Sequence, residues 1–250
     1  MKIIDADFLK MKGSQSISML TAYNYPIANR LEKAGVSAIL VGDTVGVVEM
    51  GFPTTREVKI EHMEYHISAV RRGAKNTHII GDLPYLSYSN ADFALENAKR
   101  LLSAGADSIK LEGNKTEIIS FLHKNNISVV GHIGLTPQTA KNFKQVGNTK
   151  EEAIKLINYS VEIQNAGAFM LILEHIPSQL AKKITKTISI PTIGIGAGKY
   201  CDGQVMVIND VLGLGEKWPP FSKQYDFLGN RIQKIAKKII HDISFNKEIS

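Results

Sequence analysis

Residues 35–43 read GVSAILVGD, a glycine followed by a short apolar run and an acid, and this unit recurs three more times along the chain. The glycine of each copy follows a polar stretch. Because only glycine adopts the left-handed conformation cheaply, it predicts the end of a helix. An apolar run without polar alternation is typical of a parallel strand buried on both faces. The four copies begin at Gly35, Gly73, Gly105 and Gly167 and end at Asp43, Asp82, Glu112 and Glu174.

Apolar runs of this kind predict eight strands, at residues 17–20, 38–41, 78–80, 109–111, 128–132, 169–173, 191–195 and 205–208. Helical patterns lie between most of them, at residues 25–33, 61–72, 90–103, 116–124, 150–165 and 177–187. This alternation matches a (β/α)8 TIM barrel, which typically takes about 250 residues. A doubly wound open sheet is the alternative, but no G-x-G-x-x-G run follows the first strand. We predict an α/β protein, a single-domain (β/α)8 TIM barrel over residues 1–250 with a C-terminal helix at about 226–243.

The composition, 44% hydrophobic and 22% charged, is that of a soluble globular protein. The longest apolar stretch, residues 166–173, is far shorter than the roughly 20 residues that cross a bilayer, so no membrane role is expected. Residues 1–7 contain acids where a signal peptide needs an apolar run, and the single Cys201 cannot form a disulfide within the chain. These features predict a cytoplasmic protein. Half of the net charge of +6 lies in residues 222–250, which argues against nucleic-acid binding.

The acids that follow the strands are the main functional signal. The carboxyl ends of barrel strands form the face that holds the active site, so Asp43, Asp82, Glu112 and Glu174 are expected to gather there. Crowded carboxylates repel one another and need a cation, a proton or a function, and their oxygens suit a hard ion such as Mg²⁺. Taken singly, Asp43 and Asp82 have an alternative as helix caps or turn formers. Glu112 and Glu174 fit that alternative poorly, because Glu is a poor cap and is seldom buried without a partner.

Two basic side chains lie among these acids. Lys110 stands two residues before Glu112 in the same predicted strand, so both side chains point to one face, about 7 Å apart along the chain. Lys110 is either the partner of Glu112 in a buried salt bridge or an anchor for a substrate carboxylate. His132, near another strand end, is either a core hydrogen-bonding residue or a site residue. Nucleophilic catalysis is not indicated, because the chain has no G-x-S-x-G run and Cys201 has no obvious base beside it.

Longer motifs follow one another along the chain. They are MLTAYNYP at 19–26, LVGDTVG at 40–46, HISAVRRGAKN at 66–76, GDLP at 81–84, IKLEG at 109–113, GHIGLTPQ at 131–138, PTIGIGAG at 191–198 and CDGQ at 201–204. In this order, from about residue 14 to residue 225, the sequence closely resembles the ketopantoate hydroxymethyltransferase (3-methyl-2-oxobutanoate hydroxymethyltransferase) family. The number and length of the motifs make the resemblance specific.

The resemblance implies a (β/α)8 barrel that transfers a hydroxymethyl group from 5,10-methylenetetrahydrofolate to 3-methyl-2-oxobutanoate. The product is 2-dehydropantoate, for pantothenate and coenzyme A biosynthesis, and the reaction passes through a Mg-stabilised enolate. Asp43 and Asp82 are then expected to bind Mg²⁺, with Glu112 as a further metal residue and Glu174 as the proton acceptor. The substrate-binding residues are expected to be Asp43, Thr44, Asp82, Lys110 and His132.

The predicted final helix carries isoleucines at helical spacing, Ile232, Ile235, Ile239 and Ile243, with lysines between them. Membrane or partner binding is one interpretation, and packing on the barrel or on a neighbouring subunit is favoured. The resemblance implies large homo-oligomeric rings, usually decamers, in which this helix has a packing role.

Three positions depart from the family pattern. Thr44 stands where the family has Ser, Asn24 replaces an Asp, and residues 143–148 are a loose version of a Val-Gln-Gly loop. An alternative function is that of a Mg-dependent 2-oxo acid lyase or mutase of the phosphoenolpyruvate mutase type. Such enzymes are expected to offer a catalytic cysteine loop, and the setting of Cys201 differs from one. Nucleic-acid binding is the least favoured function.

Overall fold

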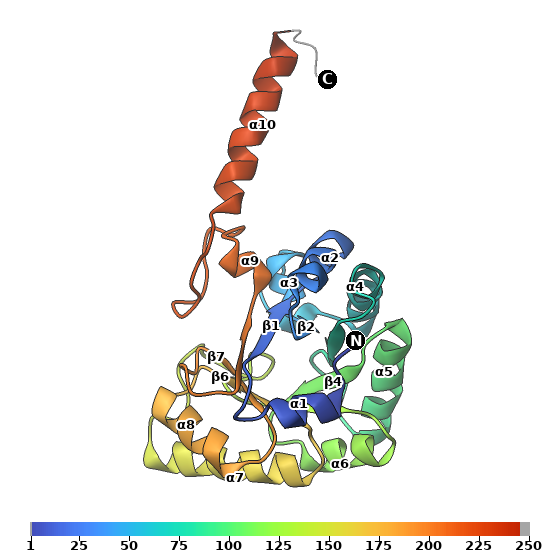
Figure 1. The fold of residues 1–250 in the computed structure, drawn as a ribbon, viewed down its shortest axis with the longest axis vertical. Helices are drawn as coiled ribbons and strands as arrows, with labels where there is room; N and C mark the ends of the chain where they lie inside the picture. Colours follow the sequence, from blue (N-terminus) through green and yellow to red (C-terminus); the bar gives the residue numbers. More distant parts are fainter. Residues whose placement is uncertain (1, 246–250) are drawn as a thin grey trace. The chain divides into compact units, whose positions relative to one another are not determined.

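Eight strands form a closed barrel in the computed structural model, which describes residues 2–245 (Figure 1). The strands are β1 (Ile17–Thr21), β2 (Ala38–Val41), β3 (His78–Asp82), β4 (Ser108–Glu112), β5 (Val129–Gly134), β6 (Met170–Glu174), β7 (Thr192–Ile195) and β8 (Gly203–Met206). Each lies beside its neighbours in chain order. Where the two ends of the sheet meet, the Ile17 N–H donates to the Asp202 carbonyl over 3.0 Å. The predicted (β/α)8 barrel is confirmed, and the open-sheet alternative is wrong.

Helices connect these strands and lie around the outside of the barrel (Figure 1). They are α1 (Asp5–Met11), α2 (Tyr25–Ala34), α3 (Val45–Val48), the 3-10 helix η1 (Thr55–Glu57), α4 (Ile60–Gly73), α5 (Ala91–Ala104), α6 (Thr116–Lys124), α7 (Lys150–Asn165) and α8 (Ser178–Thr187). Side-chain caps explain two of the starts. Thr149 accepts from the Glu152 N–H at 3.2 Å before α7, and Asn90 accepts from the Phe93 N–H at 2.9 Å before α5.

The short helices α3 and η1 are absent from the prediction, and two further segments differ from it. The apolar run at 205–208 places the last strand two residues too late, because β8 is Gly203–Met206 and Ile208 begins a short helix. The strand starts early because Gly203 lies against β1, where a Cβ would come within 2.3 Å of the Ile17 carbonyl oxygen. Helix α1 is also absent from the prediction. It has only seven residues, of which Phe8 alone is buried, so its sequence shows no helical repeat of apolar residues.

Gly73 has a different role from the other glycines predicted to end helices. The backbones of Gly35, Gly105 and Gly167 have φ of 80°, 118° and 105°, as expected for a left-handed helix end. Gly73 is the last residue of α4 and does not have a positive φ. A Cβ there would lie 2.4 Å from the Tyr25 carbonyl oxygen, so this glycine permits the close approach of α4 to α2.

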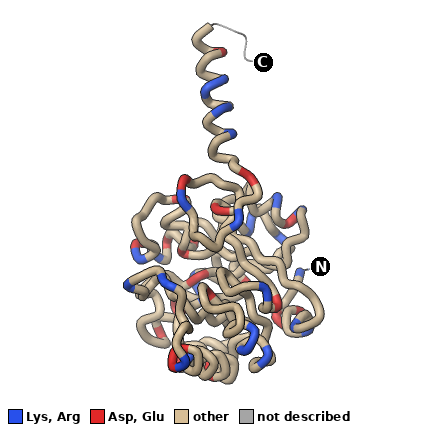
Figure 2. Tube along the Cα trace, turned by 90° about the vertical axis from the view of Figure 1, so that its left-hand side faces the viewer, with Lys and Arg blue, Asp and Glu red and all other residues tan. Residues whose placement is uncertain are grey.

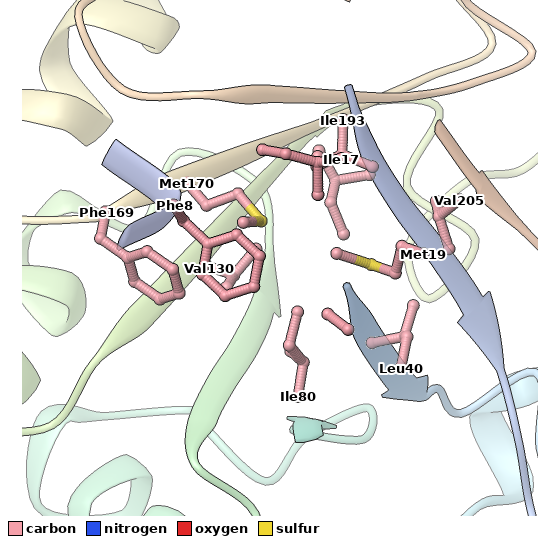
Figure 3. Close-up of a cluster of buried hydrophobic side chains, with 12 residues drawn as sticks. Phe8, Ile17, Met19, Leu40, Ile80, Val130, Phe169, Met170, Ile193 and Val205 are labelled. Atoms are coloured by element: carbon pink, nitrogen blue, oxygen red, sulfur yellow. The ribbon is translucent and has the colours of Figure 1, made fainter. Parts of the chain in front are cut away.

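Apolar side chains fill part of the barrel interior (Figure 3). Phe8 of α1 joins this cluster, with its ring centroid 5.1 Å from that of His78 and 6.2 Å from that of Phe169. The barrel is therefore a packed core rather than a pore, and the carboxyl ends of the strands are left for a polar site. The buried members of the cluster are Phe8, Ile17, Met19, Ala38, Leu40, Ile80, Val130, Phe169, Met170, Ile172, Ile193 and Val205.

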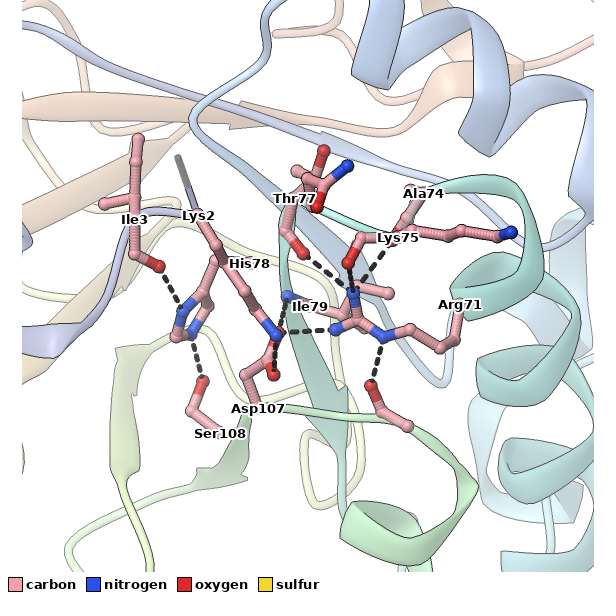
Figure 4. Close-up of polar contacts among 12 residues, drawn as sticks. Lys2, Ile3, Arg71, Ala74, Lys75, Thr77, His78, Ile79, Asp107 and Ser108 are labelled. Carbon is pink, nitrogen blue, oxygen red and sulfur yellow. Dashed lines mark hydrogen bonds and ion pairs between the residues drawn. The ribbon is translucent and has the colours of Figure 1, made fainter.

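A polar network surrounds the amino ends of β3 and β4 (Figure 4). Asp107 accepts hydrogen bonds from the side chains of Lys2 and Arg71 and from the Ile79 N–H. Burial opposes ionisation of Asp107, but these donors outweigh it and lower its pKa. His78 lies beside this group, with Nδ1 3.1 Å from the Ile3 carbonyl and Nε2 2.9 Å from Ser108 Oγ. The network ties the N-terminal segment to the barrel.

Acid is expected to weaken the fold through His78. Burial lowers the pKa of His78 below its ordinary value of 6.5, so the fold favours the neutral ring. The stability gained in this way is complete above the unfolded pKa and is lost as the pH falls below it. Urea unfolding at about pH 7.5 and about pH 5.5 should show a smaller acid-induced loss of unfolding free energy in His78→Gln than in the unsubstituted protein. The exposed His123→Gln is the control, and an equal loss in all three proteins would contradict the expectation.

The second compact unit of the chain begins at Met206 and contains α9 (Ile208–Val211) and α10 (Leu228–Ser244), the predicted C-terminal helix. No residue of α10 is buried, and its isoleucines Ile232, Ile235, Ile239 and Ile243 are 52%, 60%, 46% and 57% exposed. Packing of this face on the barrel or on another subunit stays a prediction. Within residues 2–245, every helix is too short or too polar to span a membrane. Lys and Arg are interspersed with Asp and Glu over the barrel (Figure 2).

Candidate active site

The acids and bases predicted from the strand ends come together in the barrel. Five of them, Asp43, Asp82, Lys110, Glu112 and His132, are each exposed by 4% or less. The side chain of Glu174 is 16% exposed. They come from five neighbouring strands, because Asp43 follows β2 and the others lie on β3, β4, β5 and β6. The site is therefore almost entirely buried and opens toward solvent near Glu174.

Strand register decides which of these residues face one another. Asp82 is paired with Lys110 between β3 and β4, and Glu112 with His132 between β4 and β5. Glu174 is paired with Gly134 across β5 and β6. Neighbouring strands lie about 4.8 Å apart, so side chains in register on the same face reach one another. The barrel thereby arranges the charges in a continuous line.

Lys110 lies between Asp82 and Glu112 in this line. Its Nζ lies 2.7 Å from Asp82 Oδ2 and 3.8 Å from Glu112 Oε1. The predicted contact with Glu112 is present, but Asp82 on the adjacent strand is the closer partner. Burial opposes the charged form of Lys110, and the charges of Asp82 and Glu112 outweigh burial and raise its pKa. Lys110 is therefore a buried ammonium held by two carboxylates.

His132 connects the buried acids to Glu174. Its Nδ1 lies 3.5 Å from Glu112 Oε1 and its Nε2 lies 3.2 Å from Glu174 Oε2. Burial and the charge of Lys110 oppose protonation of the ring, but Glu112 and Glu174 outweigh them and raise the pKa of His132 to about 9. The two carboxylates that face its ring nitrogens therefore favour the charged form of the ring. The predicted contact of His132 with substrate stays a prediction.

The positive charge near Asp43 and Asp82 is too small to offset the cost of burying two carboxylates. Burial raises the pKa of both, and for Asp43 the charge of Asp82 adds to this effect. Asp82 Oδ1 has no hydrogen-bond partner among the described residues. The site thus holds four carboxylates, those of Asp43, Asp82, Glu112 and Glu174, against two basic side chains, Lys110 and His132. This excess of negative charge on hard oxygen donors fits a divalent cation such as Mg²⁺.

Glu112 differs from the two aspartates in its partners. Its Oε1 faces Lys110 and His132, and its Oε2 accepts from the Gln138 N–H at 3.1 Å. Within residues 2–245, no three Asp, Glu, His or Cys side chains are arranged as they would be around one metal ion. Mg²⁺ is usually held by only one or two carboxylates and keeps several waters. The arrangement therefore suits two direct protein ligands, with Glu112 beside them.

Residues 2–247 match the sequence model of the family described as ketopantoate hydroxymethyltransferase. The chain belongs to this family. Similar relatives named 3-methyl-2-oxobutanoate hydroxymethyltransferase occur in Thermus thermophilus and Saccharolobus islandicus. Each is 44% identical to this chain; the matches cover 95% and 98% of this chain and 93% and 95% of the relatives. The resemblance inferred from the motifs is confirmed over nearly the whole sequence.

Solved structures of other enzymes share the fold of this family member. Phosphonopyruvate hydrolase matches with a TM-score of 0.66 at 11% identity, covering 97% of this chain and 88% of its own. A 2,3-dimethylmalate lyase, a member of the PEP mutase/isocitrate lyase superfamily, matches with a TM-score of 0.63 at 11% identity, covering 98% and 91%. Another phosphonopyruvate hydrolase structure contains oxalate and Mg²⁺. At these identities the likeness shows the barrel fold alone.

Two of the three departures from the family pattern have a local structural role. Asn24 Oδ1 accepts from the Ile27 N–H at 3.0 Å and so caps α2, a role that an uncharged Asn fills as well as Asp does. Thr44 directly follows Asp43 and precedes α3 without a side-chain cap bond to that helix. In the 143–148 loop, the Val146 N–H donates to the carbonyl of His175, the neighbour of Glu174. The loop is therefore attached next to the site.

Gln138 is a site residue that the sequence analysis missed. It is the last residue of the GHIGLTPQ motif and lies in the loop after β5, where no period distinguishes one residue from the next. The structure places it at 0% exposure. Its side chain donates to Asp43 Oδ2 at 2.8 Å and to the Leu83 carbonyl at 2.9 Å. The only available signal was the presence of a large polar residue within a family motif.

Proposed function

We propose that the protein transfers a hydroxymethyl group from 5,10-methylenetetrahydrofolate to 3-methyl-2-oxobutanoate, giving 2-dehydropantoate. Membership of the family supports this proposal. The observation that carries it is the buried line of contacts from Asp82 through Lys110, Glu112 and His132 to Glu174. One end of this line offers oxygen donors for a cation, and the other offers a carboxylate at the edge of solvent. A reaction that removes a proton next to a ketone needs both.

Asp43 and Asp82 would hold the Mg²⁺ that the family implies. Their excess charge and the unpartnered Asp82 Oδ1 support this assignment. When bound, the ion supplies Lewis acidity toward the oxygens of a 2-oxo acid. Lys110 contributes a fixed positive charge beside the aspartates. Its ammonium donates one hydrogen bond, to Asp82, and lies 3.8 Å from Glu112, so a further N–H donor remains for a substrate carboxylate.

Glu174 is the proposed base. It takes the proton from C3 of the oxo acid, and the electron pair of that C–H bond moves toward the ketone oxygen to give the enolate. Water adds to the methylene carbon of the folate and both of its C–N bonds break, which releases tetrahydrofolate and a one-carbon unit at the oxidation level of formaldehyde. C3 of the enolate forms a bond to this carbon as its C=O π bond breaks, and the resulting oxygen takes the proton held by Glu174 to give the hydroxymethyl group. His132 holds the carboxylate of Glu174 from the inner side at 3.2 Å, so the base keeps a fixed orientation.

Proton exchange followed by product formation tests this proposal. In D2O with Mg²⁺ and no folate, the protein should exchange the C3 proton of 3-methyl-2-oxobutanoate. Addition of 5,10-methylenetetrahydrofolate should then give 2-dehydropantoate. Exchange without product would favour the lyase or mutase alternative, and absence of both would overturn the function. Burial raises the pKa of the Cys201 thiol, which disfavours the thiolate that a cysteine-dependent alternative requires.

Gly134→Ala is expected to reduce turnover at least tenfold by displacing Glu174. Gly134 has a φ of 103°, and a Cβ there would lie 2.1 Å from the Glu174 carbonyl oxygen, so β6 must shift. Small misplacements of a catalytic group have large effects on rate. Mn²⁺ binding should be retained, because the proposed ligands come from other strands. Gly13→Ala is the control, since Gly13 has a φ of 67° and open space around it. Normal turnover in Gly134→Ala would show that this contact does not position the base.

A further inference from the structure

Gln138 joins four parts of the site that are distant in sequence. Its side-chain amide donates to Asp43 after β2 and to the Leu83 carbonyl after β3. Its own backbone N–H donates to Glu112 Oε2 at the end of β4. Its Oε1 accepts a hydrogen bond from the hydroxyl of Tyr88. One buried residue therefore contacts the carboxylates of both Asp43 and Glu112.

The partners of Gln138 fix the direction of its amide. The Leu83 carbonyl can only accept, so the atom that faces it must be the NH₂ group, and the same group faces Asp43. The remaining oxygen then faces Tyr88, whose hydroxyl must donate. Burial raises the pKa of Tyr88, so this hydroxyl keeps its proton at neutral pH. In the flipped orientation the amide oxygen would face the Leu83 carbonyl oxygen, and no hydrogen bond could form between them.

The backbone around Gln138 and Tyr88 is also held. Arg56 Nε donates to the Gln138 carbonyl at 2.8 Å, and its guanidinium also donates to the Ala140 carbonyl at 2.9 Å. The loop that carries Tyr88 is held by Asn97, a 1% exposed residue of α5 whose side chain donates to the Ser87 carbonyl at 2.8 Å. Gln138 donates to Asp43 and Tyr88 donates to Gln138, and the backbone that carries each of them is held by side-chain hydrogen bonds.

We propose that Gln138, oriented by Tyr88, is a positioning residue that holds the Asp43 carboxylate in the direction required for binding a divalent cation. This inference rests on the proposed function, since it gives Asp43 the role of a metal ligand. Without the Gln138 amide, the buried Asp43 carboxylate loses a hydrogen-bond donor that stabilises its negative charge and fixes its orientation. Partners of this kind that orient a metal ligand typically change metal affinity by about 10- to 100-fold.

Mn²⁺ binding by the full-length protein, measured as the loss of the free-ion electron paramagnetic resonance signal in the presence of 3-methyl-2-oxobutanoate, tests the proposal. Gln138→Met, which keeps the length of the side chain and removes its donors, should weaken Mn²⁺ binding about 10- to 100-fold. Tyr88→Phe should weaken it less and in the same direction. Gln15→Met is the matched control, because Gln15 is exposed and precedes β1 at the opposite end of the barrel.

The outcomes separate this inference from the proposed function. If the unsubstituted protein does not bind Mn²⁺, the proposed metal-dependent function fails. If it binds and Gln138→Met binds equally well, the positioning role is overturned while the function stands. Urea unfolding followed by circular dichroism shows whether each variant is folded. If Gln138→Met does not fold, a folded Tyr88→Phe with unchanged Mn²⁺ affinity overturns the proposal in its place.

Discussion

Glu174→Gln is expected to slow exchange of the C3 proton of 3-methyl-2-oxobutanoate by 100-fold or more, because a positioned general base contributes about 10²- to 10⁴-fold to a rate. Gln has nearly the same shape and can keep a contact with His132, which lies 3.2 Å from Glu174 Oε2. It has no lone pair basic enough to accept the proton. The measurement is the loss of the C3 proton signal in D2O by nuclear magnetic resonance.

The same variant should bind Mn²⁺ and the oxo acid normally. Glu174 lies at the opposite end of the line of contacts from Asp82, with three side chains between them. Glu96→Gln, an exposed position on α5, controls for the chemical change itself. Near-normal proton exchange in folded Glu174→Gln would remove Glu174 from the role of base. Loss of metal binding together with exchange would instead assign it to the cation site.

The strands could be predicted where burial marks the sequence directly. Every residue of β2 is buried, and its apolar run coincides with the strand. In β8 the residues alternate between buried and half-buried, and the strand begins at Gly203, so an apolar run does not mark its position. Helix α1 buries a single side chain against the core. Periodicity carries information only where an element is long enough, or buried enough, to repeat its pattern.

The gathering of the acids could be predicted, because all parallel strands of a barrel end on one face. Their partners could not, because partners depend on register across strands. Lys110 is close to Glu112 in sequence, yet the register between β3 and β4 makes Asp82 its nearest neighbour. Gln138 comes from an irregular loop, and its link to Asp43 spans 95 positions of the chain. The residue types therefore indicate the chemistry of the site, whereas the contacts between its side chains depend on the fold.

Lys110→Met is expected to cost about 3–5 kcal/mol of unfolding free energy, the usual result of removing one member of a buried ion pair. Met fills a similar volume, so lost packing contributes little. The loss comes from Asp82 and Glu112, which lie 2.7 and 3.8 Å from the ammonium and would remain buried without their cation. Urea unfolding of the variant measures the effect. Lys99→Met, at an exposed position of α5, should change stability by less than about 0.5 kcal/mol.

The variant should also respond to a divalent cation differently from the unsubstituted protein. With Lys110 gone, the buried carboxylates of Asp43, Asp82 and Glu112 have even less compensation, so an added Mg²⁺ ion relieves more repulsion in the fold. Because a ligand that binds only the folded state stabilises it by mass action, millimolar Mg²⁺ should raise the midpoint of unfolding more in Lys110→Met than in the unsubstituted protein. An unchanged midpoint in Lys110→Met without metal would show that these charges are compensated elsewhere. Lys110 and a bound cation that interact with the same carboxylates must each change the effect of the other on stability. If Mg²⁺ raises the midpoint equally in Lys110→Met and in the unsubstituted protein, Lys110 does not interact with the proposed metal site.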